Sequence, residues 1–240
     1  MPKSYKICPV EKFDRSTFDL EPFQFGHQRI LDAVPPPPQT IIYKARDRID
    51  LQDFVRYRIE HEREEQITGR TSNYNFIAFI RKEIITGFYS ELLKILLLSG
   101  RKRDILDFCD KTKNIDEIKI STIEVDMKSL LSKLPSVKGV WFKLPRGLIT
   151  ASALFGSHVE ESHDFKEYQE SGDISVLSFL FEFANNLHPI QVTQDGAIVL
   201  QGSYQEISDE IEIVLNIKNS LLDGIFKESP IQIKGGGKVM

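Results

Sequence analysis

The chain has 240 residues, of which 41% are hydrophobic and 28% charged, and its formal net charge is −4. This composition is ordinary for one large or two small folded domains and excludes a wholly disordered chain. The longest apolar run, residues 92–98, contains Lys94 and is far shorter than a membrane-spanning helix, so we expect no membrane partner.

The two cysteines, Cys8 and Cys109, show neither a CxxC motif nor the spacing of metal ligands. They indicate a reducing compartment. The first residues lack the cationic and apolar segments of a secretory signal. We therefore expect a cytoplasmic protein.

Residues 1–48 have no sustained periodicity and read as an extended arm rich in aromatic residues and proline. Disordered segments are poor in aromatic residues, so we expect the arm to be ordered against the protein itself or a second chain. The residues expected to bind a partner are Phe13, Phe18, Phe23 and Phe25. The tetraproline at 35–38 favours polyproline II, either as a stiff linker or as a docking ligand.

Residues 49–114 are predicted to be helical. A first helix begins near Asp50, a second runs from about Asn75 to Leu98 with a broad apolar stripe, and a third follows Arg101. Three helices with short connections raise the alternative of a helix-turn-helix. The apolar character of the middle helix favours a plain helical bundle. Before these helices, residues 41–43 read as a short strand.

Residues 115–234 are predicted to form an antiparallel sheet and one long helix. Apolar runs predict strands at 137–144, 148–155, 174–183, 189–193 and 197–200, and the run at 174–183 should lie centrally, covered on both faces. Asp195-Gly196 indicates a hairpin turn, and Asp126 should cap a short helix. Ser203 and Glu206 fit a capping box that starts the C-terminal helix.

The expected fold class is therefore α+β: a helical N-terminal half followed by a mostly antiparallel sheet covered by a long C-terminal helix. The expected segments are 1–48 (arm), 49–114 (helical region), 115–234 (sheet and helix) and 235–240 (flexible tail).

Charge is distributed unevenly along the chain. Lysine and arginine outnumber acidic residues 20 to 17 in residues 1–114, whereas residues 115–240 carry 11 basic and 18 acidic residues. Arginine is well suited to bind phosphate, so we expect any nucleic acid to bind to the N-terminal half. The candidate nucleic-acid-binding residues are Lys44, Arg46, Arg48, Arg101, Lys102 and Arg103.

Two sets of side chains have the types needed for chemistry. Asp116, Asp126 and Lys128 match the carboxylates and lysine of a magnesium-dependent nuclease, although Asp126 also fits a helix cap. The loop after residue 155 carries His158, Glu160, His163 and Asp164, which are residue types that bind divalent metals, or which simply form a solvated acidic loop.

Nucleotide-binding loops and the GxSxG hydrolase motif are absent, and we expect no cofactor. The absence of these motifs favours a non-catalytic protein over an enzyme. The leading functional hypothesis is a non-catalytic intracellular interaction protein, a homo-oligomer or a subunit or adaptor of a complex, supported by the aromatic arm and by the exposed edges that a sheet presents. The alternatives are a nucleic-acid-binding protein and, third, a metal-dependent hydrolase or nuclease.

Overall fold

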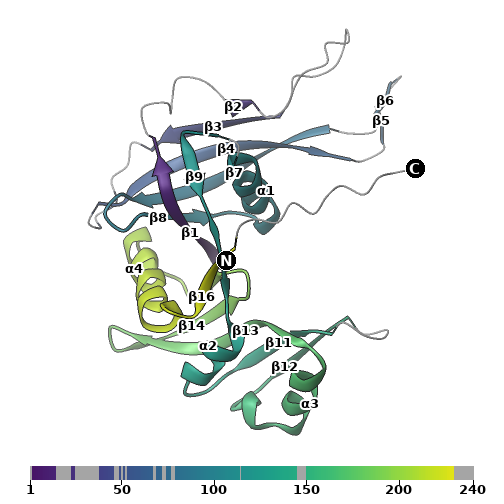
Figure 1. Cartoon of the computed structure of the whole chain (residues 1–240), viewed down its shortest axis with the longest axis vertical. Helices are drawn as coiled ribbons and strands as arrows, with labels where there is room; N and C mark the ends of the chain where they lie inside the picture. Colours follow the sequence, from purple (N-terminus) through teal and green to yellow (C-terminus); the bar gives the residue numbers. More distant parts are fainter. Residues whose placement is uncertain are drawn as a thin grey trace. The chain divides into compact units, whose positions relative to one another are not determined.

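A computed structural model describes residues 2–14, 23–24, 38–45, 49, 51, 53–66, 69–71, 74–76, 79–113, 115–144 and 150–229. The described chain is mostly antiparallel sheet with short helices (Figure 1). It divides into two compact units: unit 1 holds residues 1–7 and 121–240, and unit 2 holds residues 8–120. Strand β1 (Lys3–Phe13) contributes its first residues to unit 1 and the rest to unit 2.

Unit 1 contains an antiparallel sheet in the order β12-β11-β13-β14-β15-β1. Its other strands are β11 (Gly139–Lys143), β12 (Ala151–Phe155), β13 (Asp173–Phe183), β14 (Asn186–Thr193) and β15 (Ala197–Leu200). A separate ribbon pairs β10 (Thr122–Val125) with β16 (Phe226–Ser229). The five strands predicted between residues 137 and 200 are confirmed, and β13 does lie centrally.

The buried face of this sheet is apolar because one residue in two along each strand points to it. Directly paired residues share a face, and a row of such pairs runs through Tyr5, Ile198, Val192, Leu177, Val140 and Leu154. Only this face of β13 is buried: Ile174, Leu177 and Phe179 are covered, whereas Leu180 on the other face is 41% exposed. The expectation that both faces of β13 are covered is therefore wrong.

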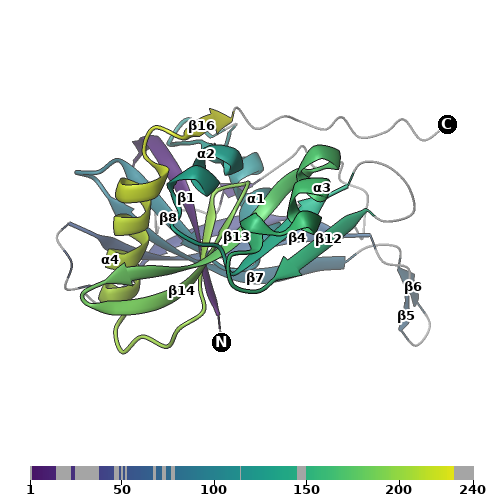
Figure 2. The same cartoon turned by 90° about the horizontal axis from the view of Figure 1, so that it is seen from below.

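Helices lie against that buried face (Figure 2). Phe165 of α3 packs edge-on against Phe142, which is two residues along β11 from Val140 and on the same face. Glu210 of α4 is buried and bonds to Tyr5 and Lys3 of β1. The helical elements of unit 1 are α2 (Met127–Lys133), a 3-10 turn at Val159–Glu161, α3 (His163–Ser171), α4 (Ile207–Ile217) and a π-turn at Lys218–Leu222.

The C-terminal helix α4 packs against β1 through Glu210, but it is shorter than the long helix that the sequence predicts. Glu206 occupies the N-cap position, and its side chain makes no capping hydrogen bond to the helix backbone, so the predicted capping box from Ser203 does not form. The helix passes into the π-turn and ends before Gly224, whose φ is +81°. Asp126, in contrast, does cap α2, because its carboxylate accepts from the backbone N–H groups of Lys128 and Ser129.

Two different turns close the hairpins of this sheet. Ala184 and Asn185 both have positive φ, 50° and 61°, as a type I′ turn between β13 and β14 requires. At the predicted Asp195-Gly196 turn only the glycine is positive, with φ +78°, and its N–H bonds to Thr193 O. That loop is a type I turn followed by a left-handed glycine, one residue longer than the type I′ turn that Asp-Gly predicts.

Unit 2 contains the remainder of β1 and a sheet in the order β8-β7-β4-β3-β2, and β9 (Ile118–Ile120) pairs with β1. The bounds are β2 (Phe23–Gln24), β3 (Gln39–Lys44), β4 (Val55–Glu65), β7 (Phe79–Ser90) and β8 (Ile95–Ser99). A small hairpin joins β5 (Gly69–Thr71) to β6 (Tyr74–Phe76). Helix α1 (Lys102–Thr112), predicted as the third helix, packs on this sheet.

The predicted fold class, with a helical N-terminal half, is wrong, since residues 55–65, 79–90 and 95–99 are strands. On β4 the buried positions from Tyr57 onward alternate strictly, but the last three are His61, Arg63 and Glu65, so hydrophobicity does not show the period of two. Between β7 and β8 the chain turns at residues 91–94 without glycine or proline. Asp53 supports this turn by accepting from Ser90 Oγ and Leu92 N.

None of the described helices is long and apolar enough to cross a membrane.

Candidate functional site

The face of the unit 1 sheet opposite the helices carries exposed apolar side chains. Phe155 of β12 is 68% exposed, and its ring meets Trp141 edge-on with centroids 4.9 Å apart. Gly139 lies beneath the ring, where a Cβ would come within 3.0 Å of Phe155 Cδ1. Glycine at this position therefore leaves room for the ring of Phe155, which a side chain would crowd.

The hairpin of β13 and β14 extends the same face. Leu180 is paired with Pro189, and Leu187 is 63% exposed opposite Glu182. These residues continue the face that carries Trp141, since Trp141 pairs with Val176 and alternate residues of β13 point the same way. Exposed apolar residues that gather on one sheet face are typical of an interaction surface.

The backbone of β12 leaves hydrogen-bonding groups open on one side. Among the described residues, β12 pairs with β11 alone. Two backbone hydrogen bonds show which residues of β12 face β11 and which face away from it. They are Leu144 N to Thr150 O at 2.9 Å and Gly156 N to Lys138 O at 3.1 Å. Ser152 and Leu154 therefore bond to β11, whereas the N–H and C=O groups of Ala151, Ala153 and Phe155 point away from it.

Natural sheets protect their edges with charges, proline or bulges. β12 has none of these: its sequence is Ala-Ser-Ala-Leu-Phe, and its register with β11 is unbroken. We call β12, together with the exposed ring of Phe155 and the half-buried ring of Trp141, the β12 edge. Chemically, this edge can accept an added strand through backbone bonds, with apolar side chains of the added strand on the open face.

A pocket of about 280 Å³ lies elsewhere in unit 1, and two of the predicted catalytic residues, Asp126 and Lys128, line it together with Glu124, Asp173 and Lys227. The Asp126 carboxylate is engaged by α2: bonds from Ser129 Oγ and from the backbone N–H of Ser129 lower its pKa, with the N–H of Lys128 and the charge of Lys227 adding to the effect. This geometry is that of a helix cap.

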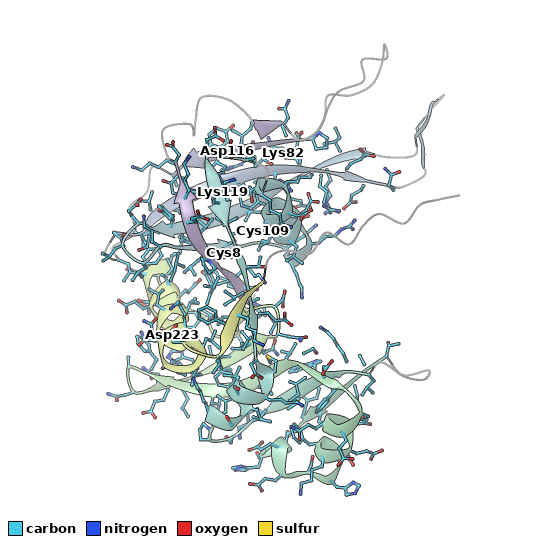
Figure 3. The ribbon with its side chains drawn as sticks, viewed as in Figure 1. Cys8, Lys82, Cys109, Asp116, Lys119 and Asp223 are labelled. Carbon is cyan, nitrogen blue, oxygen red and sulfur yellow. The ribbon has the colours of Figure 1, made fainter. Side chains whose placement is uncertain are left out.

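The third predicted catalytic residue, Asp116, belongs to unit 2. Its side chain is 93% exposed and lies 3.3 Å from Lys119 Nζ. Figure 3 labels both residues. Each of the two carboxylates, Asp116 and Asp126, thus has a local partner within its own unit. Across the described residues, no three or more His, Cys, Asp or Glu side chains gather as a metal site would require.

The predicted metal-binding loop forms the 3-10 turn and the start of α3. His158 Nδ1 lies 3.6 Å from Glu160 Oε1, and Glu160 in turn accepts from Val137 N. His163 is 90% exposed, with its Nδ1 4.0 Å from Asp164. These side chains hold the loop or face solvent rather than converging on one point.

Two of the predicted nucleic-acid-binding residues, Arg101 and Arg103, lie beside carboxylates. Arg101 bonds to Glu83 at 2.9 Å, and Arg103 lies 3.8 Å from Glu65. Lys44 is exposed at the end of β3, and Lys102 at the start of α1. Arg46 and Arg48 fall outside the described residues.

Of the four phenylalanines predicted to bind a partner, Phe13 is buried in β1, where its ring packs against Tyr57 and Tyr89. The ring of Phe13 is therefore part of the core of unit 2. Phe23 belongs to β2, and its side chain is not described. Phe18, Phe25, residues 35–37 of the tetraproline and the tail at 235–240 also lie outside the described residues.

Sequence reasoning missed a buried polar chain in unit 2. His61 is 1% exposed and sits between Thr40 Oγ1, 2.7 Å from Nδ1, and Asp107 Oδ2, 2.8 Å from Nε2. Lys111 Nζ lies 2.8 Å from the same Asp107 oxygen. The order hydroxyl, imidazole, carboxylate is that of a catalytic triad, but Thr40 is fully buried, so no substrate reaches its hydroxyl.

Desolvation by burial raises the pKa of the Asp107 carboxyl, but bonds from His61 and Lys111 outweigh it and leave the pKa below its usual value. The charged form of Asp107 is therefore favoured. The chain of bonds holds α1 against β4 and β3, and its role is structural. Only the alternation along β4 could have revealed it, because His61 falls on the same face as Tyr57 and Ile59.

No protein-family model matches this chain, and no curated protein matches it in sequence.

Proposed function

We propose that the chain is a non-catalytic interaction protein that binds an extended segment of a protein partner at the β12 edge. The observation that carries this proposal is the row of outward backbone groups at Ala151, Ala153 and Phe155, on a strand without charge, proline or bulge. A strand added here would gain main-chain hydrogen bonds, and its alternate side chains would cover the exposed ring of Phe155.

The chemistry of the edge defines the partner. β12 carries no charge, and the small side chains of Ala151 and Ala153 precede Phe155 along the open face. An added strand with large apolar residues at alternate positions fills the space over these alanines. The partner segment is therefore extended, apolar on one face and polar on the other.

Peptides selected from a random display library on the immobilised full-length chain provide the test. We expect alternating apolar sequences, which lose at least about tenfold in affinity on the Ala153→Pro variant because proline removes one outward N–H and blocks close pairing. Ala153→Thr keeps the N–H and serves as the matched control that retains binding.

Calorimetric titration of the selected peptides measures these affinities. Equal affinity for the wild-type chain and the Ala153→Pro variant would overturn the proposal, and so would a selection that recovers no peptide dependent on this edge.

A further inference from the structure

The only two cysteines of the chain meet in the core of unit 2. Cys8 on β1 and Cys109 on α1 are both 0% exposed, and their sulfurs lie 3.9 Å apart although the residues are 101 positions apart in sequence (Figure 3). We propose that this pair is an oxidisable dithiol that forms an intramolecular disulfide. This site is separate from the β12 edge and does not depend on the proposed function.

The geometry requires little movement of the chain. The sulfurs must approach from 3.9 Å to a bonding distance of about 2.05 Å. Rotation of each side chain about its Cα–Cβ bond moves the sulfur while the backbone stays in place. The backbone of Cys109 is held within α1, where its carbonyl also accepts from Thr112 Oγ1, so the helix keeps this residue in register.

The reaction balances with a two-electron oxidant. One thiol loses its proton, and the thiolate attacks a peroxide; the O–O bond breaks, and a sulfenic acid and one hydroxide form. The second sulfur displaces the sulfenic oxygen, the S–S bond closes, and the oxygen leaves as water. With a low-molecular-weight disulfide as oxidant, a mixed disulfide replaces the sulfenic acid, and two small thiols are released.

Because both thiols are buried, an oxidant cannot reach them in the fully folded chain. Neither thiol is exposed, so the reaction proceeds when α1 opens locally or while the chain folds. Once formed, the bond would tie β1 to α1 and close a loop of about 100 residues. Closing so long a loop restricts the unfolded chain more than the folded one, so the disulfide should form much more readily in the folded protein.

The test measures that difference with glutathione as the probe. The full-length chain is refolded into buffers of reduced and oxidised glutathione, and a parallel sample equilibrates in denaturant. Both samples are quenched with an alkylating agent, and the loss of two hydrogen atoms, which is two protons and two electrons, is read by mass spectrometry. We expect the equilibrium constant for the disulfide to be at least about 30-fold larger in the folded chain.

The refolding arm removes burial as an obstacle, because the thiols are accessible before folding is complete. Cys8→Ser and Cys109→Ser are the matched controls and should show only mixed disulfides with glutathione. A ratio between folded and denatured chains of one or less would overturn the proposal and show that the two thiols are only small buried side chains.

Discussion

Units 1 and 2 both bury apolar side chains beneath their sheets, but their contacts between sheet and helix differ in charge. In unit 1 the paired residues of the covered face are apolar from Tyr5 to Leu154, the buried carboxylate of Glu210 bonds to Tyr5 and Lys3, and the opposite face is open. In unit 2 the contact between β4 and α1 is charged: Arg63 and Asp104 are buried, and their side chains lie 3.2 Å apart. An apolar contact tolerates loss of a neighbour gradually, whereas a buried charge depends on its partner.

The two units also differ in the groups that are available to bind a partner. The buried charges of unit 2 are engaged with one another, as Arg63 also bonds to Glu65 and Glu65 lies near Arg81. Unit 1 keeps the ring of Phe155 and outward backbone groups exposed at the β12 edge. Recognition is therefore expected at unit 1, and unit 2 is expected to respond most to changes in charge.

The largest expected effect is a difference in stability between proline substitutions at two adjacent residues of β12. Leu154→Pro removes an N–H that bonds to β11, and we expect it to destabilise unit 1 by about 3 kcal/mol or more. Ala153→Pro removes an outward N–H and should cost less than about 1 kcal/mol. Urea unfolding followed by the fluorescence of Trp141, the single tryptophan, measures both. Similar losses in the two variants would contradict the assigned alternation.

A nearly equal effect is expected from the charges of unit 2. Asp104→Ala leaves Arg63 buried with one carboxylate fewer, and Arg63 Nη1 already has no hydrogen-bond partner among the described residues. We expect a loss of about 3 kcal/mol. The control on the same helix is Asp110→Ala, whose half-exposed ion pair with Lys113 should contribute less than about 1 kcal/mol. Circular dichroism during urea unfolding distinguishes the two.

The sequence predicted the five strands of unit 1 between residues 137 and 200 for a physical reason. Its strands carry apolar residues on the covered face and are separated by turn residues, so the period of two and the hairpins are visible. The β12 edge was anticipated only as a general risk of an open sheet, since nothing in the sequence tells which strand lies at the end of the order.

The sequence did not predict unit 2, because its inward positions are partly polar. His61, Arg63 and Glu65 follow Tyr57 and Ile59 on one face of β4, and a hydrophobicity pattern stops at Ile59. Their partners Asp104 and Asp107 lie on α1, more than 40 residues away in the chain. Contacts between residues so far apart in sequence, like that of Cys8 with Cys109, depend on the fold and cannot be predicted from local periodicity.

The acid dependence of unit 2 should show the contribution of Asp107. Its pKa is lowered in the folded state, so the stability it contributes is present above the unfolded pKa of about 3.9 and is lost as the pH falls through the folded value. At neutral pH, the free energy of unfolding of the Asp107→Asn variant should therefore be lower than that of the wild type. Below about pH 4, the free energy of unfolding should fall less steeply in the variant than in the wild type. Urea unfolding at several pH values tests this, and parallel pH profiles for variant and wild type would refute it.

The smallest effect is expected at the hairpin turn of unit 1. Ala184 has φ +50°, which is costly for a residue with a Cβ. Ala184→Gly should raise stability by about 1 kcal/mol, observed as a higher midpoint of thermal unfolding. Ala197→Gly, at a buried strand position without positive φ, should lower it. A decrease in both variants would argue against the type I′ turn.

Amide hydrogen exchange of the purified chain, read residue by residue by NMR, tests the β12 edge most directly. In the protein alone, we predict strong protection for the amides of Ser152 and Leu154 and exchange close to the unprotected rate for Ala153 and Phe155. A peptide selected on this edge should then slow exchange at Ala153 and Phe155. Protection of Ala153 equal to that of Leu154 in the protein alone would show that this edge is already paired and would contradict the account.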